Sequence, residues 1–218
     1  MNPNYINNYL KQFSQINPLD VGPYINEGGQ HYVFRYQEDK VIKVPKRSIL
    51  MRLYGLYKPA DLKNSDTNLN EIFNGYFLDI QVLASDNRRH YVIIQKYLKN
   101  ALPLTLKNFQ NVKDQFLAIV KYNHELIKLH KQALDFISFR GFFSTLLGTI
   151  LRQKYRAVME NLLVYSENGK PALKLVDANL LELKPRMTKR LNPLHWLVDQ
   201  FFYWSSKILI IDNFGVDI

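Results

Sequence analysis

The chain has 218 residues, of which 47% are hydrophobic and 13% aromatic, enough apolar surface for one large core or two small lobes. It has no cysteine, which excludes disulfides, thiolate zinc sites and cysteine nucleophiles and fits a reducing compartment. The net charge of +10 predicts an anionic partner: a nucleotide, a nucleic acid, an acidic protein or a lipid surface. Because the basic residues are spread along the chain, the pattern is not that of a nucleic-acid binder, which usually has a dense basic stripe.

The N-terminal part of the chain predicts a helix followed by strands. The opening residues lack a basic region and an apolar stretch, so no secretory signal is visible and we expect a cytoplasmic protein. Over Met1–Asn17, apolar residues recur at helical spacing and predict a short amphipathic helix. In Tyr24–Lys46, β-branched and aromatic residues alternate around a pair of glycines and an acidic turn. This segment predicts three strands in an antiparallel meander.

The middle of the chain is less regular. Ser48–Ser65 shows no clear period, and Asn68–Leu83 then predicts a helix with apolar residues on one side. Two strands are expected next, one ending near Leu83 and one over Tyr91–Gln95. The run after Lys99 is typical of a connector.

The second half predicts helices and one hairpin. Asn111–Gln132 has the pattern of a long amphipathic helix, and Phe136–Tyr155 that of a helix or a pair of helices. A β-hairpin is expected over Leu162–Val176, because Asn168-Gly169 favours a tight reversal. The order predicts an α+β fold with two lobes. Residues 1–98 would hold a small antiparallel sheet with one helix, and residues 99–218 a mainly helical lobe with the hairpin.

Two oxygen-bearing side chains flank this hairpin. Asn161 stands where a loop would close, and Asp177 stands at the end of the second strand. Amide and carboxylate oxygens are the ligands that Mg²⁺ prefers, so the pair predicts a metal site. The alternative is that Asn161 is a loop cap and Asp177 a turn residue at a strand end.

Two features of the first half are suited to binding phosphates, and an acidic residue could support one of them. Gly28 and Gly29 would let backbone N–H groups approach a phosphate, although two glycines can also simply turn a hairpin. Lys43 stands in an apolar strand, where it could contact phosphates or, at a sheet edge, protect against aggregation. Glu71 lies on the first turns of the next predicted helix and could pair with Lys43. The alternative for Glu71 is a solvated side chain near a helix N-terminus.

These motifs resemble the protein kinase-like fold, including its small bacterial sugar, antibiotic and lipopolysaccharide kinases, over Gly22–Phe202. The glycine pair is similar to a shortened glycine-rich loop, and Val41-Ile42-Lys43 to the strand that carries the phosphate-binding lysine. Asn161 and Asp177 are similar to the two metal-binding residues of that fold.

The resemblance implies that the chain binds ATP and Mg²⁺ and transfers a phosphoryl group. Asn161 and Asp177 would hold the metal, and backbone groups around Gln95 and Tyr97 would receive the adenine. Few residues follow the hairpin, which favours a small-molecule or lipid-linked acceptor over a protein acceptor.

The sequence also departs from the kinase pattern. Arg156 stands where the family has the aspartate that acts as base, and an arginine cannot accept a proton. The alternative function is therefore a pseudokinase, a nucleotide-binding scaffold that transfers nothing. Asp135 could be a displaced base or a polar residue at a helix end. The triplet Asp177-Ala178-Asn179 lacks the usual Phe-Gly, which argues against regulation by an activation loop.

The C-terminal segment allows two interpretations. Basic residues between Lys184 and Arg190 precede an aromatic stretch, which could dock on an anionic membrane at its inner face or form a buried helix. Asp212-Asn213-Phe214-Gly215 imitates the kinase Asp-Phe-Gly in spelling, and we interpret it as a chance match because no hairpin precedes it.

Overall fold

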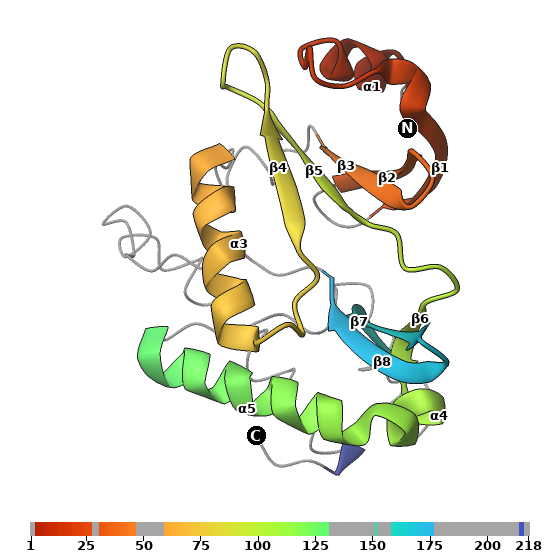
Figure 1. Ribbon diagram of the computed structural model, residues 1–218, viewed down its shortest axis with the longest axis vertical. Coiled ribbons are helices and arrows are strands. Elements are labelled where there is room, and N and C mark those ends of the chain that lie inside the picture. Colours follow the sequence, from red (N-terminus) through yellow and green to blue (C-terminus); the bar gives the residue numbers. More distant parts are fainter. Residues whose placement is uncertain are drawn as a thin grey trace. The chain divides into compact units, whose positions relative to one another are not determined.

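The structure is a computed structural model that describes residues 3–27, 31–46, 59–130, 151, 158–176 and 214–215. This part of the chain is a mixed α+β fold with a five-stranded sheet, a three-stranded sheet and helices (Figure 1). Its helices are α1 (Pro3–Leu10), α3 (Pro59–Phe73), α4 (Leu106–Phe109) and α5 (Lys113–His130), with short 3-10 turns η1 (Pro18–Asp20) and η2 (Gln110–Val112). The strands are β1 (Val21–Glu27), β2 (His31–Tyr36), β3 (Lys40–Pro45), β4 (Ile80–Ala84), β5 (Tyr91–Lys96), β6 (Leu102–Thr105), β7 (Val158–Glu167) and β8 (Lys170–Leu175).

The chain divides into two compact units. The first unit comprises Met1–Thr67 and Leu78–Leu98, and the second comprises Asn68–Phe77 and Lys99–Ile218. The boundary falls inside α3, so residues 68–77 group with the segment after Leu98 rather than with the strands that follow them.

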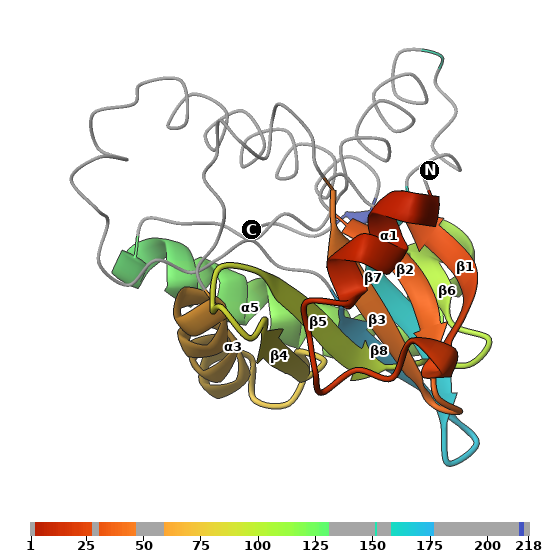
Figure 2. The ribbon, with the colours of Figure 1, turned by 90° about the horizontal axis from the view of Figure 1, so that it is seen from above.

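The first unit is built on the five-stranded sheet, in the order β1-β2-β3-β5-β4. Each neighbouring pair is antiparallel, which confirms the predicted meander and the two predicted strands after it. Helix α1 lies over strands β2 and β3 (Figure 2). Buried side chains of α1 and of the segment after it pack against alternate residues of the sheet, namely Phe34, Tyr36, Ile42, Val44, Val92 and Ile94.

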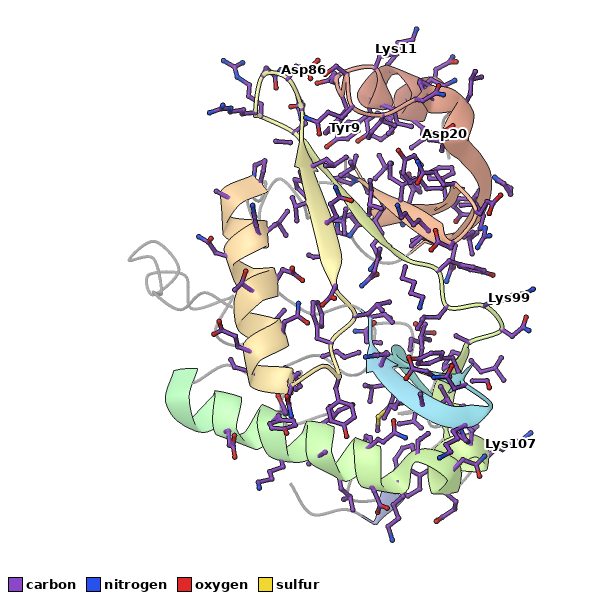
Figure 3. The ribbon with its side chains drawn as sticks, in the orientation of Figure 1. Tyr9, Lys11, Asp20, Asp86, Lys99 and Lys107 are labelled. Atoms are coloured by element: carbon purple, nitrogen blue, oxygen red, sulfur yellow. The ribbon has the colours of Figure 1, made fainter. Side chains whose placement is uncertain are left out.

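Helix α1 ends at Leu10, earlier than the predicted Asn17. The apolar residues after the helix still belong to the core, because Phe13 and Ile16 are buried in the turns that follow it. The Asp86 carboxylate accepts hydrogen bonds from the backbone N–H and the hydroxyl of Ser14, at 3.2 and 2.9 Å. These bonds tie the end of the α1 segment to the β4–β5 turn that carries Asp86 (Figure 3).

The prediction of a helix over Asn68–Leu83 was wrong at both ends, because α3 spans Pro59–Phe73. Proline is well tolerated in the first turn of a helix, where its missing N–H has no partner to lose. The helix stops where Asn74 and Gly75 adopt left-handed backbone angles, with φ of 43° and 81°. This Asn-Gly pair is a common helix stop signal.

The second unit contains the three-stranded sheet, in the order β6-β7-β8. The predicted hairpin is confirmed: β7 and β8 pair through a turn in which Asn168 and Gly169 both have positive φ, 51° and 79°. Such angles match the right-handed twist of the strands. The connector predicted after Lys99 was wrong, because that run contains strand β6, which pairs with β7.

Helix α5 confirms the predicted long amphipathic helix, with Phe116, Ile119 and Val120 buried. Phe116 packs with Phe109 and with Phe214, at ring-centre distances of 5.4 and 5.7 Å. Phe214 is therefore part of the core of this unit. The predicted helix or helix pair over Phe136–Tyr155 lies outside the described residues apart from Leu151.

Candidate functional site

Lys43 lies in the middle of the five-stranded sheet. Its strand β3 is bordered by β2 on one side and β5 on the other, with Val33 and Ile93 directly opposite the lysine. The alternative that Lys43 protects a sheet edge is therefore wrong. The side chain is only 9% exposed, and lysine is rarely buried unless its charge is matched.

The face of the sheet that carries Lys43 is the one opposite α1. Side chains alternate between the two faces along a strand. Ile42 and Val44 pack into the core beneath α1, so Lys43 and Val41 point to the other side. On that other face, the register places Val33, Lys43, Ile93 and Val82 in one row, and Arg35, Val41, Gln95 and Ile80 in the next.

Gln95 lies near the end of β5 and Tyr97 directly after this strand, and both make hydrogen bonds within the first unit. The Gln95 side chain is buried, and its Nε2 donates to the carbonyl of Leu78 at 2.8 Å. The backbone N–H of Tyr97 donates to the carbonyl of Asp39 at 2.6 Å. The Tyr97 N–H already has an acceptor, so a nucleobase at this position would form its hydrogen bonds with other backbone groups.

Arg35, which the sequence analysis did not single out, covers Tyr97. Its guanidinium carbon lies 3.7 Å from the centre of the Tyr97 ring, a cation–π contact. Its Nη2 donates to the carbonyl of Glu38 at 2.5 Å, and its Nη1 is buried with no acceptor in the described part of the chain. These contacts fix the Tyr97 ring beside the β2–β3 turn.

Glu71 lies in the last turn of α3, and its carboxylate is exposed. The expectation that it lies on the first turns of its helix was wrong. The alternative of a solvated side chain agrees with this exposure, but its place near the helix N-terminus was also wrong. A carboxylate near a helix C-terminus faces the negative end of the helix dipole, so this position offers no local stabilisation. Lys43 belongs to the first unit and Glu71 to the second, and their pairing stays a prediction.

Asn161 lies inside strand β7, where the sequence analysis expected the end of a loop. On the β6 side, Pro103 pairs with Leu163 and Leu104 with Met159, so residues 160–162 form a bulge opposite β6. Pro103 has no N–H to give to a ladder, which accounts for the interruption. Bulges change the direction in which a side chain points and are common beside functional sites.

On its other side, Asn161 is tied to the end of the hairpin. Its backbone carbonyl accepts a hydrogen bond from the N–H of Val176 at 2.9 Å. Val176 is the residue before Asp177 in the sequence. Asn161 is partly exposed, so its amide is not sealed in the core.

The remaining candidates, Gly28, Gly29, Asp135 and Asp177, lie outside the described residues, as does Arg156. Among the described residues there is no group of three or more histidine or acidic side chains able to hold a metal. No helix in the described ranges is long and apolar enough to cross a membrane.

No protein-family model and no curated protein matches the chain. Two solved structures of aminoglycoside phosphotransferases are similar to it. One is APH(2")-IIia in complex with GDP and kanamycin, at 12% identity and a TM-score of 0.34 over 95% of this chain and 82% of that chain. The other is the streptomycin–ATP complex of APH(2")-IIa, at 15% identity and a TM-score of 0.31 over 100% of this chain and 97% of that chain. TM-scores this far below 0.5 leave the kinase-like fold of this chain a prediction.

Proposed function

We propose that this chain is a kinase-like phosphotransferase that binds MgATP and phosphorylates a small-molecule or lipid-linked acceptor. The observation that carries the proposal is the burial of Lys43 on the central strand of the sheet, with Val33 and Ile93 directly opposite it on the two neighbouring strands. A lysine at this place is suited to contact the phosphates of a nucleotide, as the phosphate-binding lysine of the kinase-like fold does. Protection of a sheet edge no longer explains the lysine.

The hairpin of the second unit would hold the metal. The hydrogen bond between Asn161 and Val176 supports this role, because Asp177 is the next residue and adjacent Cα atoms lie about 3.8 Å apart. Amide and carboxylate oxygens suit Mg²⁺, which neutralises phosphate charge when it is bound. In this proposal Gly28 and Gly29 cover the phosphates, Glu71 pairs with Lys43, and backbone groups near Gln95 and Tyr97 meet the base.

We expect Lys43→Met and Asp177→Ala each to abolish the rise in melting temperature that MgATP gives the wild type. A ligand at 100 times its Kd adds about 2.7 kcal/mol of stability, which raises Tm by roughly 5–10 °C in a chain of this size. Each variant removes a group that contacts the phosphates or the metal, so this gain should disappear. The measurement is a thermal shift titration with ATP and Mg²⁺.

Lys40→Met is the matched control, because Lys40 stands on the same strand and its Nζ donates to the Gln37 side chain at 3.2 Å. It should keep the full ATP-dependent shift, and so should Asp79→Ala, since Asp79 is exposed. If Lys43→Met and Asp177→Ala both respond to MgATP like the wild type, the assignment of the site is wrong.

The catalytic base is proposed to be Asp135, because Arg156 cannot accept the proton of the acceptor hydroxyl. Removing a general base lowers a rate by about two to four orders of magnitude. Asp135→Asn should therefore keep the ATP-dependent thermal shift and lose phosphoryl transfer. The test is transfer from γ-labelled ATP into a crude extract of metabolites, lipids and proteins.

Arg156 favours a second candidate, a pseudokinase that uses bound nucleotide to hold a conformation for a partner. This alternative predicts the same thermal shifts, with no label transferred by the wild type from any extract fraction. If the wild type and Asp135→Asn transfer the labelled phosphoryl group at equal rates, Asp135 is not the base. This result would leave the proposed nucleotide site unaffected.

A further inference from the structure

His31 and Tyr91 form a buried pair at one end of the five-stranded sheet. They are the first residues of β2 and β5, and their side chains are 6% and 1% exposed. The His31 Nε2 lies 3.3 Å from the Tyr91 hydroxyl oxygen, within hydrogen-bond distance. The two rings meet edge to face, with centres 6.1 Å apart.

The pair lies on the same face of the sheet as Lys43. His31 is two residues before Val33 on β2, and Tyr91 is two residues before Ile93 on β5, where Val33 and Ile93 are the residues opposite Lys43. Residues two apart on a strand share a face. Because β2 and β5 lie on the two sides of β3, the hydrogen bond between them spans β3 next to the lysine.

Helix α1 packs on the opposite face of the sheet and does not contact this one through its core side chains. Helix α1 contacts the ends of β3 and β5 through backbone groups instead: the Tyr5 hydroxyl donates to the Pro45 carbonyl, and the Tyr9 hydroxyl to the Tyr91 carbonyl. The Tyr9 ring packs on His90, which points to the opposite side from Tyr91. The strand ends that carry His31 and Tyr91 are thereby held in place from behind.

We propose that His31, oriented by the Tyr91 hydroxyl, is a second phosphate-binding residue beside Lys43; this rests on the nucleotide binding proposed above. An imidazole N–H donates a hydrogen bond to a phosphate oxygen, and the protonated ring adds a positive charge. A histidine and a lysine held at neighbouring positions repel each other when both are charged. A phosphate between them converts this repulsion into attraction.

The test separates contact with phosphate from support of the fold. Affinities for adenosine, AMP, ADP and ATP with Mg²⁺ are measured by calorimetry for wild type and His31→Gln. A hydrogen bond to a charged group contributes about 1.5–3 kcal/mol, which is about 10–100-fold in affinity. His31→Gln should lose this factor for ADP or ATP and bind adenosine as the wild type does.

His90→Gln is the matched control, because His90 is the neighbour of Tyr91 in sequence but lies on the other face, and it should keep all four affinities. An equal loss for adenosine and ATP, or no loss, in His31→Gln would overturn the role of His31. Wild type that binds no nucleotide at all would instead overturn the proposed function, and the inference with it.

If His31→Gln does not fold, Tyr91→Phe decides the question, because it keeps the ring and removes only the hydroxyl that orients the imidazole. It should weaken ATP binding several-fold and leave adenosine binding unchanged. Unchanged ATP binding in a folded Tyr91→Phe protein would contradict the proposed orientation of His31.

Discussion

Three buried polar residues of the first unit share one face of its sheet. His31, Lys43 and Gln95 are each less than 10% exposed and lie on the face opposite α1, whereas the α1 face is filled by apolar and aromatic side chains. A polar group taken out of water costs free energy unless it is paired. The Gln95 side chain is paired with a backbone carbonyl, which assigns it a structural role.

Tyr165 makes the stability of the second unit depend on pH in the alkaline range. Burial, a hydrogen bond to Glu167 at 2.8 Å and the negative charge of Glu167 raise the pKa of Tyr165 from 10.0 to about 12. The folded chain therefore holds this proton more strongly than the unfolded chain, which releases it first as pH rises. The free energy of unfolding should fall between pH 10 and about 12.

Tyr165→Phe removes this ionisation and should show a shallower loss of stability over that pH range. Urea unfolding at several pH values for both proteins measures the difference. Tyr36, whose pKa is also raised by burial and by the charge of Asp20, contributes to both proteins alike and leaves the comparison intact. Parallel curves for wild type and Tyr165→Phe would contradict the assignment.

At the residue scale, the sequence predicted which residues lie in strands better than it predicted where those strands lie in the sheet. That Lys43 stands in an apolar strand followed from Val41-Ile42-Lys43, but its central place could not, because strand order depends on pairing across the whole unit. His31 has no local sequence signal of a function. Its two-residue offset from Val33 acquires meaning only when the register with Lys43 is known.

At the scale of elements, Gln115 joins α5 to the edge of the hairpin. Its Nε2 donates to the Pro171 carbonyl at 3.0 Å, and its Oε1 accepts from the Leu173 N–H at 2.8 Å. The side-chain amide therefore acts as a peptide group would in a further strand. This pairing satisfies an edge of β8 that would otherwise present unpaired groups.

Gln115→Ala should lower the free energy of unfolding by about 1–3 kcal/mol, because it leaves the partly buried Leu173 N–H without its acceptor. Urea unfolding measures this as a lower midpoint with an unchanged slope. Gln110→Ala is the control, since Gln110 is exposed in the short turn before α5. A loss of the same size in both variants would show that the bonds of Gln115 contribute nothing particular.

The elements with strong local signals were predicted correctly, and those that depend on distant partners were not. The Asn168-Gly169 pair predicts its turn, and the apolar spacing of α5 predicts its helix, from local sequence alone. Strand β6 has four residues, one of them a proline, and exists because β7 pairs with it. The Asn74-Gly75 pair is a helix stop signal, but the apolar residues after it continue the helical spacing and so predict a longer helix than α3.

At the scale of the whole molecule, the candidate groups fall into two sets. Lys43, His31 and Tyr91 belong to the first unit, and Glu71 and Asn161 to the second. The nucleotide proposal therefore needs groups from both units, and the thermal shift experiment tests one from each, Lys43 and Asp177. Composition alone predicted an anionic partner but no position for it, because the net charge is spread along the chain.

In the second unit, Lys174 donates to the carbonyl of Gly75, the Leu175 N–H donates to the carbonyl of Tyr76 at 2.8 Å, and Phe77 bridges Leu175. The turn after α3 is thereby fastened to the last residues of β8. Glu71 and the strand leading to Asp177 belong to one unit although a long stretch of sequence separates them, which explains why no local pattern could reveal their association.

The packing of Phe214 between Phe109 and Phe116 also bears on how the chain reaches this structure. Phe214 is distant in sequence from Phe109 and Phe116, and bringing distant segments together lowers the entropy of the chain before the contact stabilises the structure. The β4–β5 hairpin, by contrast, closes over a short turn. The packing of Phe214 is therefore expected to form later in folding than this hairpin, since distant contacts form more slowly than local ones.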